Sequence, residues 1–95
     1  MKKIIEYLLF LVALVFLYFA RGKLEAFFYN QGNDYSQRSL YKEAIGSYGN
    51  ALKINSRSWL ARLQLAEAYR DSHDYDKAVD EYNKVLNINP LCVKA

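Results

Sequence analysis

The sequence predicts an all-α protein, made of an N-terminal transmembrane helix followed by a short helix-turn-helix solenoid of two repeats. Three observations predict this architecture. Residues 4–20 are apolar at every position except Glu6. The rest of the chain repeats itself with a period of 34 residues. Within each repeat, apolar residues recur three and four positions apart, which is the spacing of one face of an α-helix.

The net charge of the chain is unevenly distributed, and it changes at the same place as the hydropathy. The 95 residues carry a net charge of +3, and a chain of this length holds one domain at most. All of the excess lies in residues 1–23, because residues 24–95 contain nine basic and nine acidic side chains. We therefore expect a membrane anchor with basic flanks over 1–23 and an electroneutral repeat domain over 24–95. The repeat domain has no basic surplus, so we expect no nucleic-acid partner.

Few residues in the chain are suited to metal binding or catalysis. The only cysteine is Cys92 and the only histidine is His73. One cysteine cannot form an internal disulfide, and a Cys/His metal site needs several such ligands. His73 lies in a predicted turn, away from any candidate nucleophile. The sequence predicts no metal site, no cofactor and no enzymatic activity.

The apolar run of residues 4–20 has the length of a short membrane span. As a helix, its 17 residues reach roughly 25 Å, and the flanking Lys3 and Arg21 can snorkel to the headgroups. A signal peptide also has a basic start and an apolar core. However, it needs small residues before its cleavage site, and Tyr18 stands where one is required before Ala20. We expect an uncleaved single-pass anchor, with a cleaved signal as the alternative. A third reading, the buried helix of a soluble fold, is disfavoured because the run is apolar on every face.

The orientation of the anchor depends on a small difference in flanking charge. Lys2, Lys3 and the α-amino group precede the apolar run, whereas Arg21 and Lys23 follow it. Because basic residues are enriched on the cytoplasmic side, this favours a cytoplasmic N-terminus by a narrow margin. The repeats would then be extracytoplasmic, which means periplasmic in a bacterium.

Residues 25–58 align with residues 59–92, and each unit is predicted to contain two helices joined by a polar turn. In the first unit the helices are expected near 24–37 and 40–54. In the second, Asp74 is expected to cap the last helix and Pro90 to end it. The matched pairs are Gly32/Ala66, Tyr35/Tyr69, Tyr41/Tyr75, Ala44/Ala78, Tyr48/Tyr82, Ala51/Val85, Leu52/Leu86, Ile54/Ile88 and Asn55/Asn89.

These paired positions resemble the tetratricopeptide repeat (TPR) family over about residues 25–92. Small residues such as Gly32 let paired helices approach closely, and aromatic residues such as Tyr48 fill the space between them. The sequence departs from the family pattern in several places, and together these departures predict a loosely packed first unit. Gln31 stands where Leu65 stands in the second unit, Arg62 replaces the first aromatic, and Ser39 and His73 occupy turns where the family often has glycine.

TPR arrays, as a family, bind proteins through a concave face built largely from the first helix of each unit. The resemblance therefore implies a protein or peptide partner. One subclass grips a C-terminal carboxylate, and Asn33 matches one of its asparagines, but the expected basic residues are missing. We expect instead a peptide with an apolar side chain and a basic group that faces Glu67. The candidate partner-binding residues are Tyr29, Asn33, Gln37, Leu63, Glu67 and Arg70.

Two repeats are few for a stable array, since repeat proteins generally need about three and a capping helix. The second unit is expected to expose Val79, Val85 and Leu86. Three explanations stay open: the chain is part of a longer array, it self-associates as a homo-oligomer, or residues 91–95 begin a third repeat or a short cap. Gly46 and Gly49 either weaken their helix or leave a smooth strip for another chain.

Together these features predict a membrane-anchored TPR scaffold or adaptor for protein–protein interaction. Two alternatives remain, a membrane-held chaperone for exported polypeptides and a cleaved, secreted TPR module.

Overall fold

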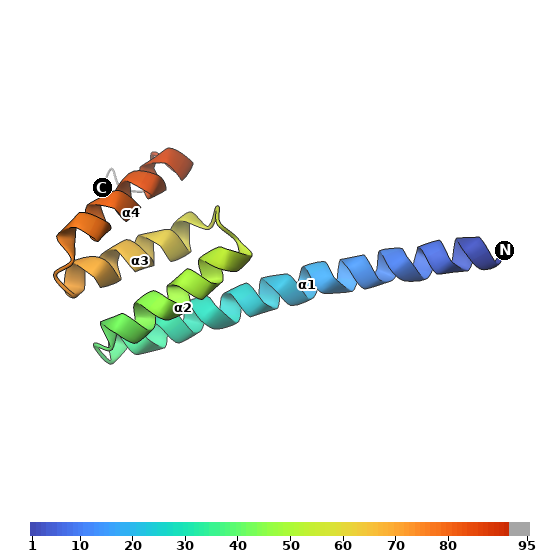
Figure 1. Cartoon of the computed structure of the whole chain (residues 1–95), viewed down its shortest axis with the longest axis horizontal. Helices are drawn as coiled ribbons and strands as arrows, with labels where there is room; N and C mark the ends of the chain where they lie inside the picture. Colours follow the sequence, from blue (N-terminus) through green and yellow to red (C-terminus); the bar gives the residue numbers. More distant parts are fainter. Residues whose placement is uncertain (92–95) are drawn as a thin grey trace.

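The computed structural model describes residues 1–91, which form four α-helices (Figure 1). In chain order they are α1 (Lys2–Gln37), α2 (Tyr41–Ile54), α3 (Trp59–Asp71) and α4 (Tyr75–Ile88). The all-helical prediction is confirmed for this part of the chain. The molecule measures 61 × 29 × 20 Å, because the N-terminal half of α1 projects from a compact group of helices.

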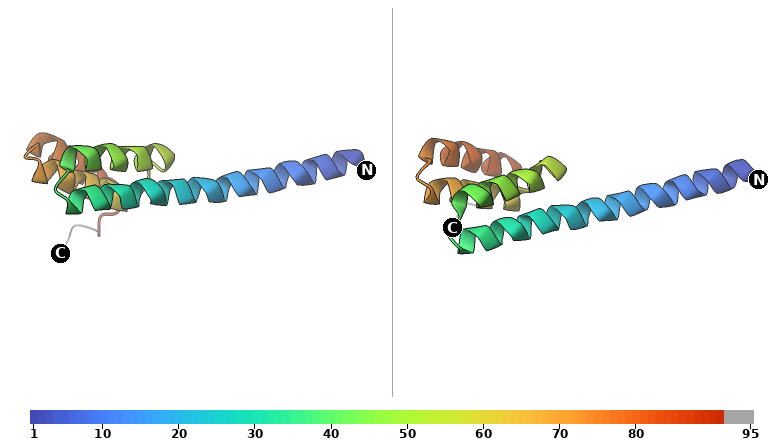
Figure 2. Two further views of the ribbon diagram at one scale, coloured as in Figure 1. Left: turned by 90° about the horizontal axis from the view of Figure 1, so that it is seen from below. Right: turned by 60° about the horizontal axis from the view of Figure 1, so that its bottom comes forward.

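The long helix α1 passes from the apolar run into the first repeat without a break. Its 36 residues include Gly22, which is helical and does not act as a hinge. An 18-residue window of α1 meets the length and composition of a membrane span, and none of it is buried. A signal sequence meets the same criteria. The reading of this run as the buried helix of a soluble fold is wrong, since no other element covers it (Figure 2).

The C-terminal half of α1 pairs with α2, and α3 pairs with α4, so that two helical hairpins stack through α2 and α3. The core lies where these hairpins meet. Its buried residues are mostly small, which lets the helices approach closely. They are Ala44, Tyr48, Ala51, Leu52, Ala61, Leu65 and Ala68.

The first unit is tightly packed, contrary to the prediction. Tyr48 is fully buried between α1 and α2, together with Ala44 and Ala51. Gln31, which replaces an apolar residue of the second unit, accepts a 2.9 Å hydrogen bond from the hydroxyl of Ser47. A polar substitution that finds a buried partner keeps the interface closed.

Two further expectations about the second unit need correction. Val85 is fully buried rather than exposed, because α4 turns this side toward α3. Asp74 holds the N-cap position of α4, but its side chain makes no capping hydrogen bond and lies 3.7 Å from Lys77 instead. α4 ends at Ile88, two residues before Pro90, as predicted. Cys92 and the start of a third repeat or cap fall outside the described residues, apart from the exposed Leu91.

The two hairpin turns hold non-glycine residues in the left-handed region. Ser39 has φ of 62° and His73 has φ of 68°. In each turn the next amide donates back to the carbonyl five residues earlier, at 2.9 Å from Leu40 and 2.8 Å from Asp74. This is the pattern of a Schellman helix end, which favours glycine at the left-handed position.

We predict that Ser39→Gly and His73→Gly each raise the free energy of unfolding by about 1 kcal/mol, because an L-residue pays roughly that much for left-handed backbone. Urea unfolding of the full chain in detergent micelles, followed by the fluorescence of Trp59, measures the change. Ser72→Gly is the matched control, since Ser72 has an ordinary φ of −88°. Equal effects of all three substitutions would contradict the prediction.

Candidate partner-binding site

The six candidate residues divide between α1 and α3, and each set shares one face of its helix. Residues on α1 are four apart and those on α3 are four and three apart, so side chains within each set are neighbours. Gln37 and Arg70 are exposed, at the ends of their helices. The half-buried members are Tyr29, Asn33, Leu63 and Glu67.

The hydroxyl of Tyr48 joins α2 to the candidate face of α1. It donates a 2.5 Å hydrogen bond to Oδ1 of Asn33 and lies 3.4 Å from the Ser36 hydroxyl. The ring of Tyr29 packs on Tyr48 with centroids 6.0 Å apart. Burial raises the pKa of Tyr48, so the phenol stays protonated and continues to donate. The oxygen of Asn33 accepts this bond, and its amide nitrogen is a donor.

Glu67 and Arg70 both act electrostatically on a second, half-buried phenol, that of Tyr82 on α4. Burial raises the pKa of Tyr82, the positive charge of Arg70 opposes this rise, and the negative charge of Glu67 adds to it. Glu67 also raises the pKa of Tyr48. The carboxylate of Glu67 is therefore within electrostatic reach of both tyrosines. Arg70 has a long contact to its neighbour, 3.4 Å from Nε to the Asp71 carboxylate.

Asn33 is thus bonded to the Tyr48 hydroxyl, and Glu67 and Arg70 act electrostatically on Tyr82, while Gln37 lies exposed at the end of α1. Sequence reasoning assigned Tyr48 and Tyr82 to packing alone and left their hydroxyls out of the site. The signal that could have found them was their exact 34-residue spacing, which places them at matching positions beneath the same face.

A buried ion pair between α3 and α4 explains why Arg62 can replace an aromatic residue. Arg62 Nη1 lies 2.9 Å from Glu81 Oε2, and the two side chains are only 15% and 11% exposed. Nη2 of Arg62 donates to the carbonyl of Ser56 at 3.0 Å, and Lys84 donates to Glu81 at 3.2 Å. The guanidinium therefore ties the second hairpin together at a position where the family uses apolar packing.

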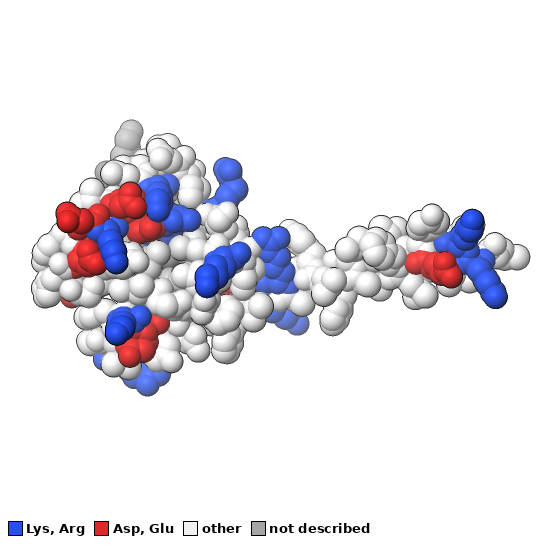
Figure 3. Space-filling view, in the orientation of Figure 1, with Lys and Arg blue, Asp and Glu red and all other residues white. Residues whose placement is uncertain are grey.

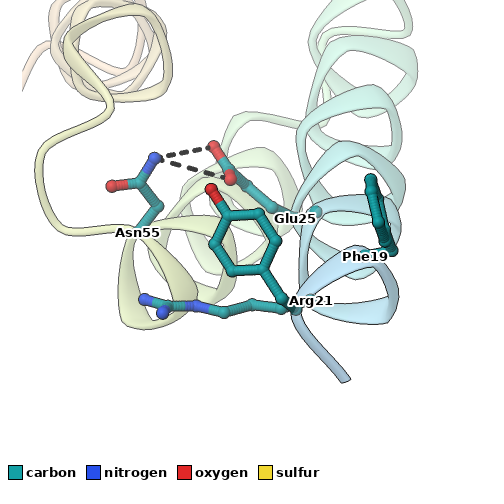
Figure 4. Close-up of a pocket in the computed structure, with 6 residues that line it drawn as sticks. Phe19, Arg21, Glu25 and Asn55 are labelled. Carbon is teal, nitrogen blue, oxygen red and sulfur yellow. Dashed lines mark hydrogen bonds between the residues drawn. The ribbon is translucent and has the colours of Figure 1, made fainter. Parts of the chain in front are cut away.

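A hollow of about 300 Å³ lies where the apolar half of α1 meets the repeats (Figure 4). Here Arg21 reaches across from α1, and its Nε donates to the carbonyl of Ile54 at 2.9 Å. Asn55 Nδ2 lies 3.4 Å from the nearer oxygen of Glu25. The last carbonyls of a helix are unpaired and carry partial negative charge, so a cation is well placed at the end of α2. The side chain of Arg21 therefore caps the C-terminal end of α2, a contact that the sequence did not indicate.

A family model described as tetratricopeptide repeat matches residues 37–94, more than half of the chain. The chain belongs to the tetratricopeptide repeat family. The match begins at the end of α1 and covers the whole of the α2–α4 region. The apolar half of α1 lies outside it. No curated protein matches the chain. The predicted family is confirmed, and TPR membership supports a protein–protein interaction module in general.

Proposed function

We propose that this TPR protein is a membrane-anchored scaffold or adaptor, and that the apolar half of α1 is an uncleaved single-pass anchor. The observation that carries the proposal is the continuity of α1, which runs from a fully exposed apolar segment into the packed repeats. A domain held at a membrane meets membrane-bound partners at a raised effective concentration. Flanking charge favours an extracytoplasmic repeat domain.

Membrane extraction and protein sequencing test the anchor. An integral protein stays in the membrane pellet at alkaline pH, and an uncleaved anchor returns Met1 or Lys2 at its N-terminus. Release at alkaline pH, or a new N-terminus near residue 21, would instead support the secreted module. Reporter fusions at the C-terminus would establish on which side the repeats lie.

Cross-linking in native membranes separates the adaptor from the chaperone alternative. An adaptor gives one or two dominant cross-linked partners, because its binding face is specific. A chaperone that binds unfolded apolar segments gives a broad distribution of products. A photoreactive residue at the exposed Gln37 would place the probe beside the candidate face without disturbing Tyr48 or Tyr82.

We propose that the face formed by the candidate residues binds a peptide whose basic group pairs with Glu67. The carboxylate of Glu67 is half-buried, and a partly desolvated negative charge favours a cationic partner. We predict that Glu67→Lys weakens binding of a basic peptide from the cross-linked partner at least tenfold, equivalent to about 1.4 kcal/mol. Fluorescence anisotropy measures the affinity. Glu43→Lys on the exposed start of α2 makes the same charge change and should leave affinity unaltered.

Self-association is supported by an uncovered stripe on α4. Val79 and Leu86 are 57% and 40% exposed, and with Tyr75 and Tyr82 they recur on one helix face. We propose that a second copy of the chain covers this stripe, since anchors confined to one membrane bring copies together. Sedimentation of the full chain in detergent should show a dimer or larger assembly, and a monomer at all concentrations would contradict this.

A further inference from the structure

The bond between Arg21 and Ile54 sets the height of the repeat domain relative to the apolar run. Arg21 is the first residue after Ala20, where the apolar run ends, and its Nε lies 2.9 Å from the Ile54 carbonyl. The turn from α2 to α3 is thereby held at the level where an anchor in a bilayer would meet the headgroups. Lys53 precedes Ile54, and Arg57 follows three residues later, and both are exposed.

Four basic residues consequently gather at this end of the domain. We refer to Arg21, Lys23, Lys53 and Arg57 as the basic collar. Glu25, whose carboxylate lies 3.4 Å from the uncharged amide of Asn55, offsets one of these four positive charges, and Glu81 is paired with Arg62. In the face shown in Figure 3, blue side chains lie where the rod meets the domain, whereas toward its far end red and blue side chains stand side by side.

The opposite end of the domain carries both signs of charge. The turns there join α1 to α2 and α3 to α4, and they carry most of the acidic residues. Four basic residues, Arg38, Lys42, Arg70 and Lys77, also lie at or beside these turns, so this end lacks the basic excess of the collar. The acidic residues at or beside these two turns are Asp34, Glu43, Asp71, Asp74 and Asp76.

We propose that the basic collar binds the anionic phospholipid headgroups of the leaflet that the repeat domain faces, and so holds the domain against the bilayer. This inference rests on the proposed membrane anchor. Anionic leaflets attract basic residues close to the surface, and the attraction decays over a Debye length of about 8–10 Å. The Arg21 bond holds Ile54, and with it the adjacent Lys53, at the level of Arg21. Leu24 and Leu60 are exposed beside the collar and add apolar contact with the interface.

The single tryptophan of the chain is a natural probe of this contact. Trp59 begins α3, two residues after Arg57, and is half-buried. We suggest placing the full chain in nanodiscs of phosphatidylcholine, with or without phosphatidylglycerol, containing a lipid spin-labelled on its headgroup. Quenching of Trp59 should be at least twofold stronger in the anionic nanodiscs. The difference should disappear at about 1 M salt, where the Debye length is near 3 Å.

Matched charge reversals test whether the collar is responsible. The double variant Lys53→Glu/Arg57→Glu should lose the extra quenching in anionic nanodiscs. The control Lys42→Glu/Lys77→Glu makes the same change at exposed positions near the far turns and should retain it. Circular dichroism checks folding, and Lys53→Gln/Arg57→Gln serves if the reversal disturbs the helices.

Two results would overturn the proposal: equal quenching in neutral and anionic nanodiscs, or unchanged quenching in the collar variants. Failure of the anchor itself is distinguishable, because such a chain would not co-elute with nanodiscs of either composition.

Discussion

Replacing Glu81 by leucine should lower the free energy of unfolding of the TPR domain by about 3 kcal/mol. The change leaves the guanidinium of Arg62, only 15% exposed, without the carboxylate that lies 2.9 Å from it. When one member of a buried ion pair is removed, the other charge stays poorly solvated and has no partner, which destabilises the fold. Urea unfolding in detergent micelles, followed by Trp59 fluorescence, measures the loss of unfolding free energy. Urea is preferred to guanidinium chloride because urea is uncharged and does not screen the ion pair.

The double variant Arg62→Met/Glu81→Leu separates the ion pair from simple packing. Replacing both charges by apolar groups of similar size is often neutral or stabilising, so most of the loss should be recovered. Asp80→Ala is the surface control, because Asp80 also approaches Lys84, at 3.4 Å, but is 68% exposed. It should cost less than about 0.5 kcal/mol. A double variant as unstable as Glu81→Leu would show that the buried charge is not the cause.

The second large effect is expected at Gly32, where Gly32→Ala should destabilise the domain by about 2 kcal/mol. A Cβ at this position would lie 2.5 Å from Cε1 of Tyr48, far inside van der Waals contact. The ring has little room to yield, because it is fully buried and its hydroxyl is bonded to Asn33. Denaturation in micelles, as above, reports the change in unfolding free energy.

Gly46→Ala should have the opposite sign and is the matched control for Gly32→Ala. A Cβ at Gly46 meets nothing within 4 Å, so alanine should raise stability by about 0.5–1 kcal/mol through helix propensity. The clash at Gly32 should be partly relieved by Tyr48→Leu, which gives a double-mutant cycle with a clear coupling between the two sites. Additive effects of Gly32→Ala and Tyr48→Leu would contradict the proposed contact. Gly49 is equally open, and a role for these two glycines as a strip for another chain stays a prediction.

The local structure of the chain could be predicted well from the sequence. Apolar spacing placed α2 to within one residue, and the 34-residue period predicted the two-hairpin architecture and the family. The close approach at Gly32 also followed, because a small residue opposite a large one is a property of the repeat pattern. The same repeat pattern predicted Asn33, Glu67 and Arg70 as candidate partner-binding residues. It did not indicate a role for the hydroxyls of Tyr48 and Tyr82.

The contacts between residues on different helices became known only from the tertiary structure. Arg62 meets Glu81, 19 positions later, and Arg21 meets the carbonyl of Ile54, 33 positions later. The apolar periodicity predicts which residues share one face of a helix. It does not predict which helix faces pack against each other, or how far one helix is shifted along the axis of another. The sequence therefore determined the helices, the repeat and the apolar segment of α1. The packed helices decided that Val85 is buried, that Arg62 is paired, and that the basic collar lies at the end of the apolar run.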